Sequence, residues 1–147
     1  MAKSSSSQDV RIRDATKADA EAVAGLLREL GYECNATQAA ARIAAGGADA
    51  VLLALSGDEP VGLATLHVTR MLQHQRPVAR VTALVVNAAA RGRGIGRLLL
   101  DRAVALGRER GCGLVELTSA TGRMEAHGFY EANGFGLSAL RFHRVLD

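Results

Sequence analysis

Residues 81–97 read VTALVVNAAARGRGIGR, which is a strand-like apolar run, then a glycine-rich turn, then the start of a helix. Glycines at 92, 94 and 96 let backbone N–H groups approach a ligand closely, and the N-terminal dipole of the following helix favours an anion. Arginines at 91, 93 and 97 add positive charge around the turn. The stretch therefore predicts a pyrophosphate site between a strand and a helix.

This turn differs from the two most common nucleotide-binding loops. It lacks the Gly-Lys-Ser/Thr ending of a nucleoside-triphosphate loop, and its glycine spacing misses the Gly-x-Gly-x-x-Gly dinucleotide fingerprint. A plain strand-to-helix turn with solvated arginines stays open as an alternative. Cys34 and Cys112 lie far apart without metal-ligand spacing, so we expect buried thiols and no metal.

Hydrophobic periodicity predicts the elements around the turn. Strands are predicted at 10–13, 50–55, 61–68, 78–86, 114–117 and 140–145, and helices at 20–30, 37–45, 95–106 and 124–133. Three successive strands with short loops favour an antiparallel meander, and the helix after residue 94 lets strand 114–117 lie parallel to strand 78–86. The predicted fold is α/β, with a mixed, mostly antiparallel six-stranded sheet.

Composition limits the class of protein. The chain has 147 residues, 48% of them apolar, so one domain over residues 9–147 can bury a core, and serine-rich residues 1–8 predict a flexible tail. The N-terminus has no apolar stretch long enough for a signal peptide or membrane span, so we expect a cytoplasmic protein without a membrane partner. A net charge of +3 with no Trp, two Tyr and three Phe disfavours a nucleic-acid partner. A small polyanion fits the clustered arginines better.

Two motifs, in this order, resemble the GCN5-related N-acetyltransferase (GNAT) family. The family's Gln/Arg-x-x-Gly-x-Gly/Ala loop after the fourth strand is matched by Arg91, Gly94 and Gly96. Its Ala-x-x-Phe-Tyr-x-x-x-Gly-Phe string on the last helix is matched by Ala126, Phe129, Tyr130, Gly134 and Phe135. The resemblance covers about residues 10–145 and implies helices on both faces of a sheet that splays between its fourth and fifth strands.

The resemblance also implies a reaction and its residues. An acetyl group would pass from acetyl-CoA, the cosubstrate, to a primary amine by direct attack in a ternary complex. Tyr130 would be the catalytic acid that protonates the leaving thiolate, and backbone amides in 84–86 would stabilise the oxyanion. The residues expected to bind the cofactor are Leu84, Val85, Val86, Arg91, Gly92, Arg93, Gly94, Ile95, Gly96, Arg97, Ser119 and Tyr130.

The general base is not assigned, because Thr82 and Ala83 stand where the family often has a strand-four glutamate. Glu116, His67 and His74 are candidates, and each also fits a surface or structural role. The missing glutamate leaves a second hypothesis open, a non-catalytic CoA-binding sensor or partner subunit on the same fold. The acceptor, a small-molecule amine or a protein amine, stays open. Family habit favours a homodimer through the apolar segment 137–145.

Overall fold

The computed structural model describes residues 9–118, 124–139 and 141–146. Within this part of the chain no helix is long and apolar enough to cross a membrane. The elements follow in the order β1 (Val10–Asp14), η2 (Lys17–Asp19), α1 (Ala20–Leu30), α2 (Ala36–Ala44), β2 (Ala50–Ser56), β3 (Glu59–Thr69), β4 (Val78–Val86), η3 (Ala88–Ala90), α3 (Ile95–Glu109), β5 (Leu114–Leu117) and α4 (Met124–Ala132), where η marks a short 3-10 turn.

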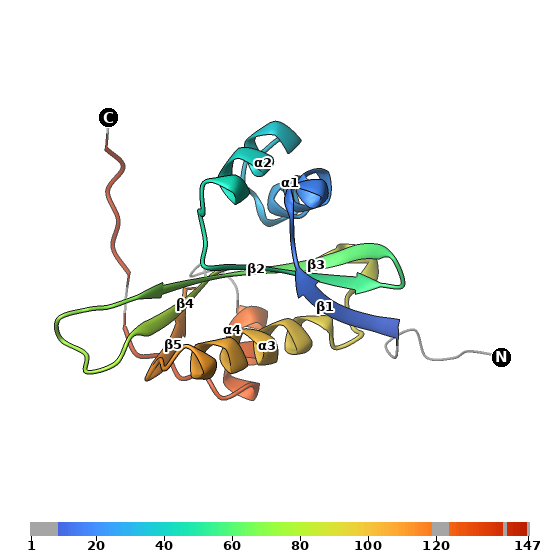
Figure 1. Ribbon diagram of the computed structural model, residues 1–147. Coiled ribbons are helices and arrows are strands. Elements are labelled where there is room, and N and C mark those ends of the chain that lie inside the picture. The colour runs from blue at the N-terminus through green and yellow to red at the C-terminus, as the bar shows by residue number, and fades with distance from the viewer. Residues whose placement is uncertain (1–8, 119–123, 140, 147) are drawn as a thin grey trace.

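One sheet runs through the molecule in the order β1-β2-β3-β4-β5 (Figure 1). The first four strands pair antiparallel, and β5 pairs parallel to β4. The predicted meander and the parallel crossover through α3 are therefore confirmed. Short polar turns make the meander possible, as at Gly57, whose φ of 61° lies in the left-handed region that glycine adopts without strain.

The described residues form a sheet of five strands, so the prediction of six was wrong. Residues 141–146, which cover most of the expected last strand, form no strand and run away from the sheet (Figure 1). Their apolar side chains are exposed, with Phe142 at 87% and Leu146 at 84%. Arg141 Nη1 donates to Thr118 Oγ1 at 3.0 Å, which attaches the start of the segment to the end of β5. The segment has the apolar residues of a strand, but a strand also needs a neighbour to pair with.

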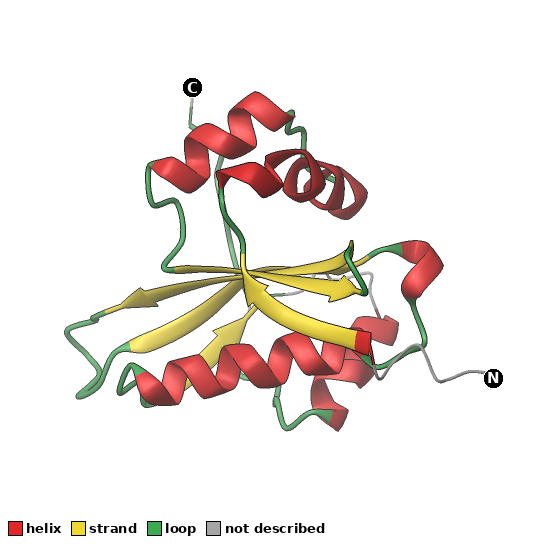
Figure 2. Cartoon of the chain, turned by 45° about the vertical axis from the view of Figure 1, so that its right-hand side comes forward, coloured by secondary structure: helices red, strands yellow, loops and turns green. Residues whose placement is uncertain are grey.

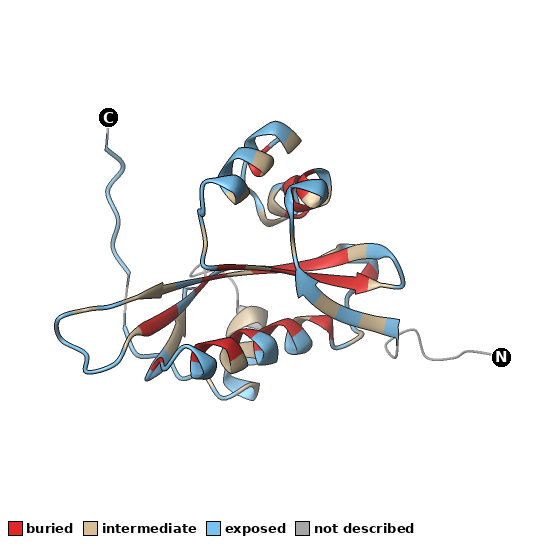
Figure 3. Cartoon of the chain, viewed as in Figure 1, coloured by how far each residue is buried: buried red, intermediate tan, exposed pale blue. Residues whose placement is uncertain are grey.

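Helices cover both faces of the sheet, with α1 and α2 on one side and α3 and α4 on the other (Figure 2). Each side has its own apolar core. Leu53 and Leu63 face α1 and α2, whereas Leu52, Leu66 and Leu99 belong to the cluster on the α3 side. Figure 3 shows the buried residues along the sheet and on the inner side of α3. Each such leucine contributes roughly 1.5–3 kcal/mol of transfer free energy to folding.

Helix α3 packs closely against the sheet at two places, and a glycine stands at each of them. A Cβ at Gly62 would lie 3.0 Å from Leu99 Cδ1 and 3.2 Å from Ile95 Cγ2, and one at Gly107 would lie 3.1 Å from Val115 Cγ2. Side chains larger than hydrogen would push the helix outward. Gly62 therefore fixes the N-terminal part of α3 against β3, and Gly107 fixes its C-terminal part against β4 and β5.

Candidate functional site

The glycine-rich stretch forms the predicted strand-turn-helix junction. After β4 the chain makes the 3-10 turn η3, and α3 begins at Ile95. Gly92 and Gly94 have φ values of 82° and 77°, a region in which residues with a Cβ are strained. Ile95 is 1% exposed, so the first turn of the helix is anchored in the core. The backbone of the turn is thus held in one shape by its two left-handed glycines and this buried isoleucine.

The N-terminus of α3 presents its backbone N–H groups to the turn. Gly94 occupies the N-cap without a side chain that could cap the helix, and the first turn contains no acidic residue. The first intrahelical bond runs from Leu98 N to Gly94 O at 3.1 Å. The N–H groups of residues 95–97 therefore have no acceptor within the helix, and the positive end of the dipole lies at the same place. This arrangement suits a phosphate group.

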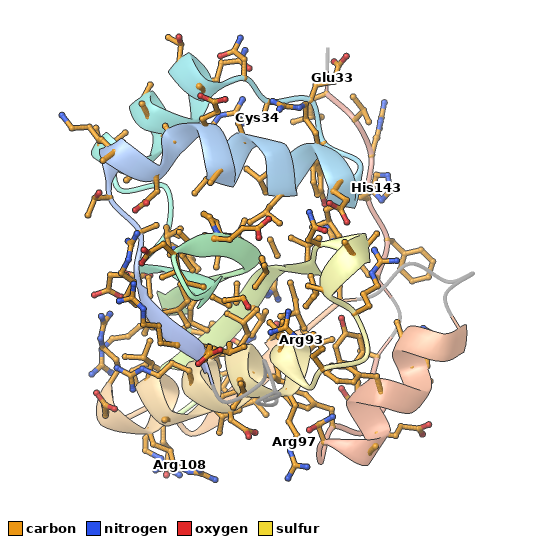
Figure 4. The ribbon with its side chains drawn as sticks, turned by 90° about the vertical axis from the view of Figure 1, so that its right-hand side faces the viewer. Glu33, Cys34, Arg93, Arg97, Arg108 and His143 are labelled. Carbon is orange, nitrogen blue, oxygen red and sulfur yellow. The ribbon has the colours of Figure 1, made fainter. Side chains whose placement is uncertain are left out.

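The three arginines of the turn have different environments. Arg91 Nε donates to Val86 O at 3.3 Å, and its Nη2 lies 3.7 Å from a carboxylate oxygen of Glu29. Arg93 Nη2 donates to Ser56 Oγ at 2.9 Å and lies near the centre of the molecule in Figure 4. Arg97 is exposed on the outer side of α3. Arg93 thus supports the turn through a protein contact, whereas the side chains of Arg91 and Arg97 are 63% and 73% exposed and each lies within 4 Å of one carboxylate, of Glu29 and Asp101.

An unpaired edge of β4 begins beside the turn. β4 pairs with β3 as far as Val86, but its pairing with β5 stops at Val81 opposite Leu117. Asn87 N donates to Val61 O at 2.8 Å, so by strand alternation Val85 also directs its N–H toward β3. The N–H and C=O groups of Leu84 and Val86 then face the other edge, where the described residues place no strand. We call this edge, residues 82–86 of β4, the slot.

Helix α4 packs against the glycine turn through Phe129. A Cβ at Gly96 would lie 3.4 Å from Phe129 Cζ. The Tyr130 ring stands edge-on to Phe129 and Phe135, with ring centroids 5.5 and 6.3 Å away. All three rings are half-buried against the α3-side core, as expected for Phe129 and Phe135. Of the predicted cofactor-binding residues, Ser119 lies outside the described residues.

Polar side chains occupy the other face of the sheet, next to the closed end of the slot. Arg80 lies between Ala79 and Val81, whose side chains belong to the α3-side core, so Arg80 points to the face that carries α1 and α2. Glu116, between Val115 and Leu117, does the same. Arg80 Nε donates to Glu116 Oε2 at 2.8 Å, and Arg80 Nη2 donates to the same oxygen. The two residues form an ion pair across β4 and β5.

Two further polar pairs lie on this face. Thr65 Oγ1 and Thr82 Oγ1 are 2.6 Å apart, and either can be the donor. His67 Nδ1 lies 3.1 Å from Asp49 Oδ2. Together with the Arg80–Glu116 pair they form what we call the polar row. The sequence predictions missed Arg80, Thr82 and Asp49 as members of one site, although strand alternation already places Arg80 and Thr82 on one face.

The three candidate bases end in different places. Glu116 and His67 lie on the polar row, each in contact with a charged partner. His74 is exposed in the turn between β3 and β4, where its backbone N–H donates to Met71 O at 3.1 Å. That turn is at the opposite end of β4 from Val86. The structure therefore brings two of the three candidates near the slot.

Comparison with known proteins identifies the family. Residues 19–135 match the acetyltransferase (GNAT) family, and the chain belongs to it. It is 37% identical over 94 residues to the aminoalkylphosphonate N-acetyltransferase of Salmonella typhimurium, covering 64% of this chain and 61% of that relative. It is 35% identical over 135 residues to glucosamine 6-phosphate N-acetyltransferase 1 of Oryza sativa subsp. japonica, covering 85% and 80%. The chain thus spans about three fifths of the first relative.

A solved structure supports the same assignment. The putative acetyltransferase from Agrobacterium tumefaciens superposes with a TM-score of 0.83 at 28% identity, covering 92% of this chain and 99% of that one. The mixed sheet with helices on both faces is therefore shared by this chain and a family member of nearly the same extent.

Proposed function

We propose that this protein is an N-acetyltransferase that moves an acetyl group from acetyl-CoA to a primary amine. The observation that carries the proposal is the junction of two features, the slot along β4 and the open N-terminus of α3 that starts at its end. One accepts an extended chain with amide groups, and the other accepts a pyrophosphate. CoA has these two parts next to each other, a pantetheine arm joined to a pyrophosphate that carries the adenosine end.

In the proposed complex the pyrophosphate lies against the N–H groups of residues 92–97, with Arg91 and Arg97 as the solvent-facing cations of the turn. The pantetheine arm follows the slot and pairs with the backbone of Leu84 and Val86, as an added strand would. Val85 directs its backbone to β3 and supports the site through its buried side chain. The sequence prediction placed the backbone amides of all three residues 84–86 in the site.

The proposed chemistry is direct acyl transfer. The neutral amine attacks the thioester carbonyl, a C–N bond forms, the C–S bond breaks, and the amine loses one proton. An N–H of Leu84 or Val86 would donate to the oxyanion. Tyr130 would donate its phenolic proton to the leaving sulfur, because a phenol is protonated at neutral pH and its helix packs beside the turn. Proton loss from the amine would involve a group of the polar row.

A small amine is the proposed acceptor. The two relatives compared above are named for small amines, an aminoalkylphosphonate and an amino sugar phosphate. We also propose a cytoplasmic location, consistent with an acetyl-CoA cosubstrate.

A thermal-shift titration with acetyl-CoA, CoA, ATP and NADH tests the cosubstrate. A ligand at 100 times its Kd stabilises the folded state by about 2.7 kcal/mol, which raises the midpoint of a chain this size by several degrees. We expect this shift with acetyl-CoA and with CoA, and no shift with ATP or NADH. Binding without turnover of any amine would favour the non-catalytic sensor instead.

The variant Gly94→Glu locates the site. Its carboxylate would stand against the pyrophosphate at the N-terminus of α3, so the acetyl-CoA shift should disappear. Gly46→Glu is the matched control, because Gly46 also has a left-handed φ, 73° against 77°, and open space around it. Both variants carry the same backbone strain, so a shift that survives in Gly94→Glu would contradict the phosphate assignment.

A further inference from the structure

We propose that the polar row is the acceptor site and that Arg80, held by Glu116, binds an oxyanion carried by the acceptor amine. The inference rests on the proposed function and adds the class of substrate, a small hydrophilic amine that bears a phosphonate, phosphate or carboxylate. It begins with the direction from which an acceptor can reach the slot.

As far as the described residues show, the approach to the slot is open on one face of the sheet. The slot closes where Val81 pairs with Leu117, and on the α3 side this point belongs to the buried core, with Val81 only 4% exposed. On the opposite face α1 and α2 cover Leu63 and Val85 farther along the strands, whereas Arg80 and Thr82 are exposed. An amine that reacts with an acyl group in the slot therefore arrives across the polar row.

Arg80 retains hydrogen-bonding capacity for a ligand. A guanidinium has five N–H donors, and Glu116 Oε2 accepts from Nε and from Nη2. The two donors of Nη1 and the second donor of Nη2 remain. One N–H of Nη1 and this N–H of Nη2 point in parallel and form a two-pronged fork. The Arg80 side chain is 47% exposed, so solvent reaches it. A fork of this shape binds a carboxylate or phosphoryl group through two parallel hydrogen bonds.

Glu116 fixes that fork before any ligand binds. The ion pair spans two neighbouring strands at a register position where Arg80 faces Glu116 directly. The guanidinium therefore loses little additional freedom on binding, which favours affinity and orientation. It also means that Glu116 serves as the partner of Arg80 rather than as a freely available base.

Spacing limits the acceptor to a small molecule. Arg80 lies two residues from Thr82, about 7 Å along a strand, and Thr82 is the first residue of the slot. A single short molecule can thus place its amine at the slot and its oxyanion at Arg80. Thr65 and Thr82 add hydroxyl groups that can bond to polar substituents between the two. The side chains of the row include no carbocyclic aromatic ring that would favour an arylamine.

The test compares amines that differ in the oxyanion. Acetyl transfer to 2-aminoethylphosphonate is measured against ethanolamine, and transfer to glucosamine 6-phosphate against glucosamine. In the wild-type protein we expect a kcat/KM ratio of at least tenfold in favour of the oxyanion-bearing member of one pair. In Arg80→Met that ratio should fall by roughly tenfold or more through KM, as loss of a charge-assisted bond implies. Arg80→Lys keeps the charge without the fork, so its kcat/KM ratio should lie between those of the wild-type protein and Arg80→Met.

Controls separate binding from folding. Arg70→Met removes an exposed arginine from the turn after β3 and should keep the wild-type ratio. The double variant Arg80→Met/Glu116→Gln removes both charges, so no unpaired carboxylate destabilises the sheet, and it should show the same loss of ratio. The acetyl-CoA thermal shift should persist in every variant.

Two results would overturn the inference. One is a wild-type protein with equal kcat/KM values for the two amines of each pair. The other is an Arg80→Met variant whose kcat/KM falls by the same factor for both amines of a pair. Failure of the proposed function would look different, since acetyl-CoA would then produce no thermal shift in the wild-type protein.

Discussion

Tyr130 is held between two phenylalanine rings on a helix that packs against the glycine turn. If it protonates the leaving thiolate, Tyr130→Phe removes the proton and leaves the packing. We expect kcat to fall roughly 10²-fold or more, the usual size of a general-acid contribution, with a nearly unchanged acetyl-CoA thermal shift. Tyr32→Phe is the control, because Tyr32 is 58% exposed beyond α1. Equal kcat values for Tyr130→Phe and wild type would assign Tyr130 to packing alone.

Asp19 makes a pH-dependent contribution to stability. Arg13 donates to both of its oxygens at 2.8 and 2.9 Å, and this contact, with the Thr16 N–H, lowers the Asp19 pKa from 3.8 to about 2. A carboxyl whose pKa is lower in the folded state stabilises the protein above its unfolded pKa, and this stability is lost as pH falls toward 2. The contribution should therefore be complete at pH 5 and fade between about pH 4 and 2.

Urea unfolding of wild type and Asp19→Asn across this range measures the effect. The difference in unfolding free energy should narrow as pH falls, from about 1 kcal/mol at pH 5, the upper end for an ion pair that solvent can reach. Asp58→Asn is the control, since Asp58 pairs with Arg11 in full solvent exposure. A difference that stays constant from pH 5 to 2 would show that Arg13 does not lower this pKa.

Single residues were the hardest part of the site to predict. Glycines 92 and 94 were predictable, because a left-handed turn before a helix leaves few other choices. Arg80 was not identified, because its meaning depends on Glu116, which lies 36 positions away and meets it only through the register of β4 and β5. Local patterns reveal which face a side chain occupies, but not its partner on the next strand.

At the scale of elements, the close contact between α3 and the sheet gives a direct test. Gly62→Ala would place a methyl group 3.0 Å from Leu99 Cδ1 and 3.3 Å from Val85 O. The backbone oxygen cannot move freely, so we expect a loss of about 1–3 kcal/mol in unfolding free energy, as in other overpacked cores. Denaturant unfolding measures it.

Gly25→Ala in the middle of α1 is the matched control. Its added methyl group would meet only the flexible end of Arg28 at 3.8 Å, so helix propensity should make this variant equally or more stable. A Gly62→Ala protein as stable as Gly25→Ala would mean that α3 can shift without cost, and the argument that Gly62 fixes its N-terminus would fail.

Most elements were predictable to within a few residues. Helix 37–45 is found at Ala36–Ala44, and strand 61–68 at Glu59–Thr69. The exception is the last strand. Residues 140–145 include apolar residues typical of a strand. Whether such a segment pairs depends on an edge contributed by another part of the structure, which the local sequence does not reveal.

At the scale of the whole molecule, the exposed apolar segment supports the expected homodimer. Leu137, Phe142, Val145 and Leu146 are each more than 80% exposed. Side chains of this size, buried reciprocally in two copies, would remove roughly 1,000 Å² or more from water, which reaches the lower limit of stable interfaces. β5 also has an unpaired outer edge in the described sheet, which a second copy could cover.

Size-exclusion chromatography with light scattering tests this expectation. The wild-type protein should have the mass of a dimer, and Phe142→Asp should shift it toward the monomer. Leu72→Asp is the control, because Leu72 is also fully exposed, in the turn between β3 and β4. A monomeric wild-type protein, or a dimer unaffected by Phe142→Asp, would rule out this segment as the contact.

The slot has a consequence for how long the protein survives in a cell. Among the described residues, 82–86 of β4 pair with a strand on one side only, so backbone groups on the other side can bind a ligand. A ligand that occupies this edge only in the folded state lowers the population of opened molecules in proportion to its concentration, and opened molecules are the ones that proteases cut. Under the proposed function, starvation for acetyl groups would therefore shorten the half-life of the protein. The amount of the protein in the cell would then rise and fall with the concentration of acetyl-CoA.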